Sequence, residues 1–203
     1  MEKNLLSKTV VLVIHEIYGV NQHMEMVTQA FTNLGYDVIC PDLLNRDIPF
    51  DYSEEADAYR YFMDNIGFHT ASERVASIVQ DCRERYDRIF IVGFSIGATI
   101  AWLCSRHECL TGIVGYYGSR IREYLDIAPT CPALLFFPER EKSFHVNELI
   151  QRLKEQNHFV YQLSAQHGFS DSYSESYNEK AASEAFSKTL QFVKEAESLG
   201  LIM

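Results

Sequence analysis

Residues 88–104, RIFIVGFSIGATIAWLC, form the stretch that decides the fold. Within it, Gly93-Phe94-Ser95-Ile96-Gly97 matches the pattern G-x-S-x-G. By ordinary frequencies of Gly and Ser, this pattern arises by chance in roughly one chain in fifteen of this length. The surroundings make it informative, because a run of Ile and Val enters the pattern and an apolar helical segment leaves it. The stretch therefore predicts a strand, a tight turn centred on Ser95, and a helix.

The chemistry of such a turn favours a reactive serine. Glycines two residues before and after Ser95 would relieve clashes between the strand and the helix. The serine hydroxyl would then project above the sheet. The amide of Ile96, at the start of the helix, can donate to an oxyanion. The alternative is a Gly-rich turn in which the serine only caps the helix.

Short β-branched and aromatic runs alternate with longer amphipathic segments along the rest of the chain. The predicted strands are residues 9–14, 36–40, 88–92, 110–116, 133–137 and 158–163, and the predicted helices are residues 22–34, 71–86, 96–105, 146–156 and 178–199. Nearly every residue of the first strand is apolar, which is typical of a strand covered on both faces. The order predicts an α/β fold with a doubly wound, mostly parallel sheet of about six strands and helices on both faces.

The chain is expected to form one domain over residues 1–203, without a large cap domain. Its length suffices for one well-buried core, and no repeat, low-complexity tract or linker interrupts it. Residues 42–67 are less regular and rich in aromatic and acidic side chains. Two interpretations of the aromatic stretch 50–68 stay open: it overhangs a pocket, or it packs a helix onto the sheet.

Charge and cysteine content exclude several function classes. The formal net charge is −10 and the pI is about 5.1, which disfavours nucleic acid and anionic membranes as partners. The five cysteines are odd in number and form no Cys-x-x-Cys pair, so neither a disulfide framework nor a zinc site is expected. No apolar stretch is long enough to span a membrane. We expect a cytoplasmic protein, a monomer or small homo-oligomer, whose partner is a small molecule.

A nucleophilic serine needs a neighbouring base. In the α/β-hydrolase fold, which is built around a G-x-S-x-G elbow, the chain order is serine, then acid, then histidine. Three histidines follow the acid candidates: His145, His158 and His167. His158 begins a predicted strand and His145 opens a predicted helix. His167 lies in a polar loop between the last strand and the last helix, and it is the predicted base.

The acid is expected just after the strand 133–137, where Glu139 and Glu141 lie. A carboxylate there would orient the imidazole and stabilise its charged form. We favour Glu141, with Glu139 as the alternative; either could also be an ordinary surface charge. The segment after the first strand contains Ile17, in a turn that normally supplies the second oxyanion donor from its backbone.

In longer segments the sequence resembles the dienelactone hydrolase family. The matching segments, in chain order, are VLVIHEIYGVNQHM, GYDVICPDLL, IFIVGFSIGATIAWL, YYGSRI, CPALLFF and QHGF. The resemblance implies an α/β-hydrolase fold, Ser95 as nucleophile, Glu141 as acid and His167 as base. It also implies an oxyanion hole formed by the amides of Ile17 and Ile96, and it places Glu16 beside the nucleophile.

Three departures from the family pattern bear on the substrate. Dienelactone hydrolases proper carry cysteine at the position of Ser95, and the acid is usually aspartate rather than the glutamate found at Glu141. Arginines that would hold the carboxylate of a dienelactone are not identifiable. We therefore expect a serine hydrolase that cleaves a small ester or related acyl substrate through an acyl-enzyme, without a metal or organic cofactor. The alternatives are a non-catalytic binding protein, or an acyltransferase, thioesterase or peptidase on the same scaffold.

Overall fold

The computed structural model describes residues 8–141, 144–156 and 158–199. Its strands form one sheet in the order β2-β1-β3-β4-β5-β6, and every neighbouring pair is parallel. The strands are β1 (Thr9–Ile14), β2 (Asp37–Ile39), β3 (Arg88–Phe94), β4 (Gly112–Tyr116), β5 (Ala133–Pro138) and β6 (Phe159–Leu163). The predicted parallel sheet is confirmed.

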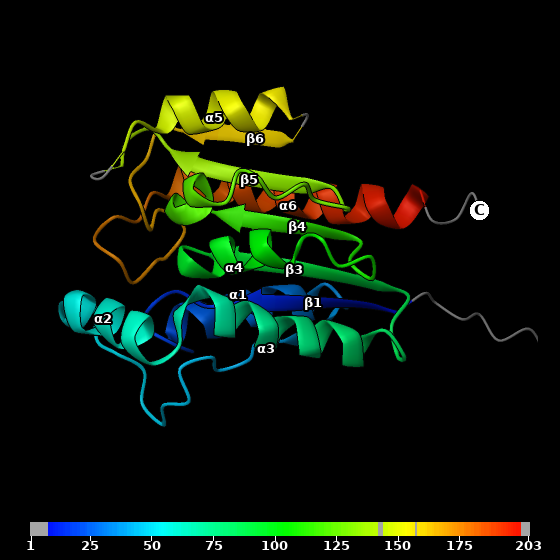
Figure 1. Ribbon diagram of the computed structural model, residues 1–203, viewed down its shortest axis with the longest axis horizontal. Coiled ribbons are helices and arrows are strands. Elements are labelled where there is room, and N and C mark those ends of the chain that lie inside the picture. The colour runs from blue at the N-terminus through cyan, green and yellow to red at the C-terminus, as the bar shows by residue number, and fades with distance from the viewer. Residues whose placement is uncertain (1–7, 142–143, 157, 200–203) are drawn as a thin grey trace, which may run out of the picture.

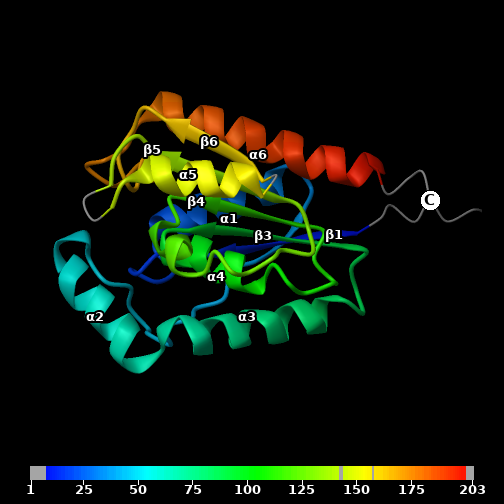
Figure 2. The ribbon, with the colours of Figure 1, turned by 45° about the horizontal axis from the view of Figure 1, so that its top comes forward.

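Helices cover both faces of this sheet (Figures 1 and 2). They are α1 (Gln22–Asn33), α2 (Glu55–Asn65), α3 (Gly67–Cys82), α4 (Ile96–Cys104), α5 (Val146–Glu155) and α6 (Glu179–Leu199), with two short 3₁₀ helices, η1 (Tyr52–Glu54) and η2 (Ser119–Glu123). Helices α1 and α6 pack on one face, and α3, α4 and α5 pack on the other. Between β2 and β3 the described chain forms η1, α2 and α3, without a cap domain.

Strand β1 shows why the centre of the sheet is apolar on both sides. Val10, Leu12 and Ile14 face the core under α3 and α4, whereas Val11 and Val13 face the core under α1 and α6. All five are fully buried. Burying an aliphatic side chain of this size contributes about 1.5–3 kcal/mol relative to leaving it exposed. The strand is therefore apolar on both faces from Val10 onward, as its sequence predicts, and its one polar residue, Thr9, lies at its start.

The order of the strands places a crevice at one end of the sheet. From β1 the chain passes first to β2 on one side, and later to β3 on the other side. In such sheets ligands bind where the strand order reverses, beyond the carboxyl ends of the strands. His15 follows β1 directly and Ser95 follows β3 directly. The fold thus brings these two segments to the same edge.

The irregular region before β3 contains more helix than the sequence predicts. Helix α2 lies within residues 42–67, and α3 begins at Gly67 rather than at residue 71 and ends at Cys82 rather than at residue 86. The chain turns sharply between the two helices, at Ile66 (φ −129°, ψ −66°) and Gly67 (φ +70°). Glycine adopts a positive φ without steric cost, so α3 can begin at Gly67, directly after α2. Helical periodicity in the sequence indicates a start only at residue 71.

All five cysteines are free thiols. Among the described residues, no helix combines the length and the apolar character that crossing a bilayer requires.

Candidate active site

Ser95 lies on a strained turn between β3 and α4. Its backbone angles, φ 51° and ψ −110°, are uncommon for a residue with a Cβ. The turn is held on both sides: the Ser95 amide donates to the Tyr116 carbonyl at 2.9 Å, and the Ser95 carbonyl accepts from the amides of Ala98 and Thr99 at 3.2 and 3.3 Å. The neighbouring strand and the first turn of α4 therefore fix the direction of the serine side chain.

The two glycines of the motif allow three backbone segments to approach closely. A Cβ on Gly93 would lie 2.1 Å from the carbonyl oxygen of Gly97, and a Cβ on Gly97 would lie 2.2 Å from the carbonyl oxygen of Ile14. Both distances are far shorter than any van der Waals contact. The spacing G-x-S-x-G is thus required where β1, β3 and α4 meet.

The structure brings the three predicted triad residues into one hydrogen-bonded line. Ser95 Oγ lies 2.9 Å from Nε2 of His167, and Nδ1 of His167 lies 2.7 Å from Oε1 of Glu141. The side chain of His167 is 39% exposed and that of Glu141 is 7% exposed. His167 comes from the loop after β6, and Glu141 from the loop after β5. A glutamate thus reaches the imidazole of a histidine that in turn contacts the serine.

The alternative residues lie elsewhere. Glu139 is exposed and accepts a hydrogen bond from the hydroxyl of Ser164 at 3.1 Å. His158 packs edge-on against Trp102, with ring centroids 5.1 Å apart, and His145 is exposed at the start of α5. The geometry therefore separates Glu141 from Glu139, which the sequence alone leaves open.

Opposing effects set the proton affinity of His167. Burial lowers its pKa, whereas the hydrogen bond and the negative charge of Glu141 raise it, and the charges of Glu16 and Glu55 add to the increase. The net result is a pKa above the ordinary value for histidine. This histidine accepts a proton readily, as a general base must.

The two residues predicted to supply the oxyanion donors line the same cavity as Ser95. Ile17 follows β1 and Ile96 begins α4, and both line the cavity with Ser95. Within the described part of the chain, neither amide donates a hydrogen bond to another backbone group. The positive end of the α4 dipole adds to the pull on an anion. The fold therefore brings both predicted oxyanion-hole residues to the cavity that contains Ser95.

The cavity around Ser95 has a volume of about 1230 Å³. Tyr52 and Tyr59 lie in its wall, whereas Phe50, Phe62 and Phe68 are buried in the core. The aromatic stretch thus contributes both to the cavity and to helix packing. Acidic side chains outnumber basic ones in the lining, which includes Glu16, Glu55, Glu139, Glu141, Asp171 and Glu175 but only two arginines, Arg120 and Arg140.

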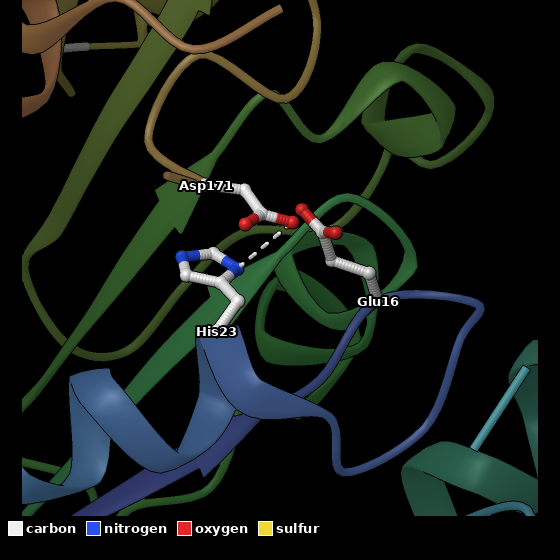
Figure 3. A group of neighbouring side chains, drawn as sticks. All are labelled: Glu16, His23 and Asp171. Carbon is white, nitrogen blue, oxygen red and sulfur yellow. Dashed lines mark ion pairs between the residues drawn. The ribbon is translucent and has the colours of Figure 1, made fainter. Parts of the chain in front are cut away.

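A second acid–histidine group lies beside this cavity, and sequence analysis missed two of its members. Glu16, His23 and Asp171 are buried, and one ligand atom of each lies within 4.8 Å of the others (Figure 3). Nδ1 of His23 lies 3.7 Å from Oδ2 of Asp171. The sequence offers only one sign of this group, which is that His23 falls on the buried face of the predicted helix 22–34. Its proximity to Asp171, which lies in a loop far along the chain, is visible only in the structure.

Comparison with known proteins gives the chain its family. The model of the dienelactone hydrolase family matches residues 2–197. The chain is 41% identical over 193 residues to the uncharacterized protein YczH of Bacillus subtilis (strain 168), covering 94% of this chain and 93% of that protein. It is 26% identical over 211 residues to a carboxymethylenebutenolidase of Pseudomonas putida, covering 93% and 86%.

Solved structures share the fold. A candidate dienelactone hydrolase from Klebsiella pneumoniae superposes with a TM-score of 0.75 at 21% identity, over 94% of this chain and 88% of that one. A dienelactone hydrolase-like promiscuous phosphotriesterase from metagenomic libraries gives a TM-score of 0.72 at 15% identity, over 94% and 87%. With the elbow, the sheet order and the family model in agreement, the chain belongs to the dienelactone hydrolase family of hydrolases.

Proposed function

We propose that this protein is a serine hydrolase that cleaves a small ester or related acyl substrate through an acyl-enzyme on Ser95. The observation that carries the proposal is the line from Ser95 through His167 to Glu141, with contacts of 2.9 and 2.7 Å, at a strained strand–helix turn. The relatives named carboxymethylenebutenolidase support the same reaction class, because a butenolide is a cyclic ester.

In the first step Ser95 Oγ attacks the substrate carbonyl carbon while Nε2 of His167 takes the hydroxyl proton. The amides of Ile17 and Ile96 receive the oxyanion, and each such donor typically lowers the barrier by about 3 kcal/mol. The tetrahedral intermediate then breaks the bond to the leaving oxygen. His167 returns its proton to that oxygen, so an alcohol leaves and an ester to Ser95 remains.

In the second step water replaces the alcohol. His167 takes a proton from the water, whose oxygen attacks the acyl carbonyl, and the bond to Ser95 breaks as the proton passes to its Oγ. The carboxylate of Glu141 accepts the Nδ1 hydrogen bond of His167 in both steps. It holds the Nδ1 proton of His167, which fixes the tautomer that leaves Nε2 free to act as base.

The charge of the cavity bears on the substrate. Glu55, Glu139 and Glu175 line the same cavity as Ser95, and one of the two arginines, Arg120, is already paired with Glu123. An anionic acyl group would meet like charges in a confined space. We therefore infer an uncharged or cationic substrate with a partly apolar group, placed against the tyrosines of the wall.

Labelling with a fluorophosphonate tests the nucleophile, because such probes react with activated serines. Intact-mass spectrometry should show a single adduct on the wild-type protein and none on Ser95→Ala. Ser172→Ala is the matched control, since Ser172 is exposed in the loop that carries His167 and does not line the cavity. An adduct that persists in Ser95→Ala, or a wild-type protein that does not react, would refute the proposal.

We also infer that the protein works in a reducing, cytoplasmic compartment as one domain, with a small molecule as its partner. The free thiols and the net charge of −10 support this setting.

A further inference from the structure

The cluster of Glu16, His23 and Asp171 is not used by the serine mechanism. Its members come from the loop after β1, the first turn of α1 and the loop after β6, and their side chains point toward one another (Figure 3). Glu16 is 5% exposed, His23 is 2% exposed and Asp171 is fully buried. Three potential metal ligands are thus assembled out of bulk solvent, at the wall of the cavity that Glu16 and Asp171 line.

Several polar atoms of the cluster have no hydrogen-bond partner among the described residues. These atoms are Oε1 of Glu16 and both ring nitrogens of His23. Buried polar atoms are nearly always paired in folded proteins, and an unpaired one calls for an explanation. Nδ1 of His23 faces Asp171, whereas Nε2 points away from both carboxylates (Figure 3). One unpaired nitrogen of His23, Nδ1, therefore lies on the side of the carboxylates of Glu16 and Asp171.

The charge of the cluster is also unbalanced. Two carboxylates are buried close together, and no lysine or arginine in the described ranges forms an ion pair with either one. Burial raises the pKa of Glu16; the charge of His23 opposes this, and the charge of Asp171 adds to it. Buried charges are normally paired or bound to a metal ion. A divalent cation would neutralise both carboxylates at once.

Further residues hold the cluster in place from outside. Asp171 Oδ2 accepts a hydrogen bond from the hydroxyl of Tyr52 at 2.5 Å, and its Oδ1 accepts one from the amide of Tyr173 at 2.9 Å. Burial raises the pKa of Glu16, whereas the hydroxyl of Tyr117, which is hydrogen-bonded to Ser170 at 2.8 Å, lowers it. Metal ligands are commonly oriented by hydrogen bonds of this kind. The carboxylates are therefore positioned before any ion arrives.

We propose that Glu16, His23 and Asp171 form a binding site for a divalent transition-metal ion, for which Zn²⁺ is the best match. One imidazole and two carboxylates suit Zn²⁺, and ligand atoms about 2.1 Å from a tetrahedral ion lie about 3.4 Å apart. The 3.7 Å between His23 and Asp171 is close to that value, and the distances to Glu16, which are at most 4.8 Å, would shorten when an ion binds. Three protein ligands leave one position, open to water or a substrate oxygen from the cavity.

Metal titration of the chelator-treated protein tests this site. Co²⁺ serves as a visible probe through its d–d absorption, and Zn²⁺ should displace it with a stoichiometry of one. Glu16→Gln and Asp171→Asn preserve shape while weakening the ligands, and His23→Leu removes one. Each should lower the affinity for Zn²⁺ by more than about 100-fold, and Tyr52→Phe, which acts only through Asp171, by about 10-fold.

Two controls separate the site from other histidines. His69→Ala removes an exposed histidine that lies 3.4 Å from Glu73, and it should bind Zn²⁺ as the wild type does. His167→Ala should also retain binding, although it disrupts the proposed triad. Circular dichroism and the midpoint of urea denaturation check that the ligand variants fold. The proposal is overturned if the wild type binds neither ion, or if His167→Ala abolishes binding while His23→Leu preserves it.

Discussion

Two acid–histidine groups lie at the same edge of the sheet and differ in how their polar atoms are paired. In the first, His167 contacts Ser95 and Glu141 at 2.9 and 2.7 Å, and its ring is partly exposed to the cavity. In the second, His23 is buried, its nitrogens are unpaired, and the nearest carboxylate oxygen lies 3.7 Å away.

The difference in distance matters chemically. The 2.7 Å contact between Nδ1 of His167 and Oε1 of Glu141 is the length of a charge-assisted hydrogen bond. A histidine held in this way is suited to gain and lose a proton at its other nitrogen, Nε2. The 3.7 Å between Nδ1 of His23, which has no hydrogen-bond partner, and Oδ2 of Asp171 leaves room for an ion that both atoms can bind. Similar residue types at one edge of the fold thus favour proton transfer in one case and cation binding in the other.

Replacing the nucleophile should have the largest effect. Ser95→Ala is expected to reduce kcat on a chromogenic acetate ester by about 10⁶-fold, because the proposed covalent step is lost. Zn²⁺ affinity of the same variant should be unchanged. Steady-state kinetics and calorimetry on one preparation measure both, with Ser172→Ala as control. Turnover by Ser95→Ala close to the wild-type value would contradict the proposal that the group containing His167 serves Ser95 as nucleophile.

Replacing the acid of the first group should come next. Glu141→Gln is expected to reduce kcat by about 10⁴-fold, because an amide no longer enforces the tautomer that leaves Nε2 of His167 unprotonated. Glu139→Gln, two residues earlier, should have little effect because Glu139 contacts Ser164 instead. Comparable losses in the two variants would contradict the assignment of Glu141.

Removing either histidine should change stability in opposite directions. In the metal-free protein, His23→Leu is expected to raise the free energy of unfolding by about 1–3 kcal/mol, because it eliminates two buried nitrogens that lack hydrogen-bond partners and because the 3.7 Å to Asp171 is too long for a hydrogen bond. His167→Leu should lower it by about 1–3 kcal/mol, since it leaves the carboxylate of Glu141 without its partner. Urea denaturation measures both values. Destabilisation by His23→Leu equal to that by His167→Leu would show that the buried group is satisfied without an ion.

The smallest effect is expected in the pH profile. The proposed base is active when neutral, so kcat/KM should fall as the pH drops through the pKa of His167, which Glu141 holds above the ordinary value. Glu141→Gln removes the group that favours the protonated ring, so the midpoint of the acid limb should move to lower pH. Rates measured across the acid and neutral range provide the test. A midpoint that moves upward would contradict the proposed hydrogen bond.

Much of the fold follows from local sequence, because alternation and helical spacing depend on residues close together in the chain. The six strands and the covered faces of the sheet are predicted in this way. Helix α2 is not, because its inner face consists of few residues, Ala58 and Phe62, amid acids and tyrosines. The position of α2 is set by its packing against α3, which follows the turn at Gly67.

The sequence by itself determined the elbow around Ser95. The backbone there is so closely packed that only glycine fits at positions 93 and 97, and this requirement is visible in the sequence as the pattern G-x-S-x-G. Chain order was enough to predict His167 as the base. Only the tertiary structure places Glu141, rather than Glu139, against His167, and it alone brings Glu16, His23 and Asp171 together. Where a loop side chain points, and which distant segment it meets, depends on packing that has no periodic signature in the sequence.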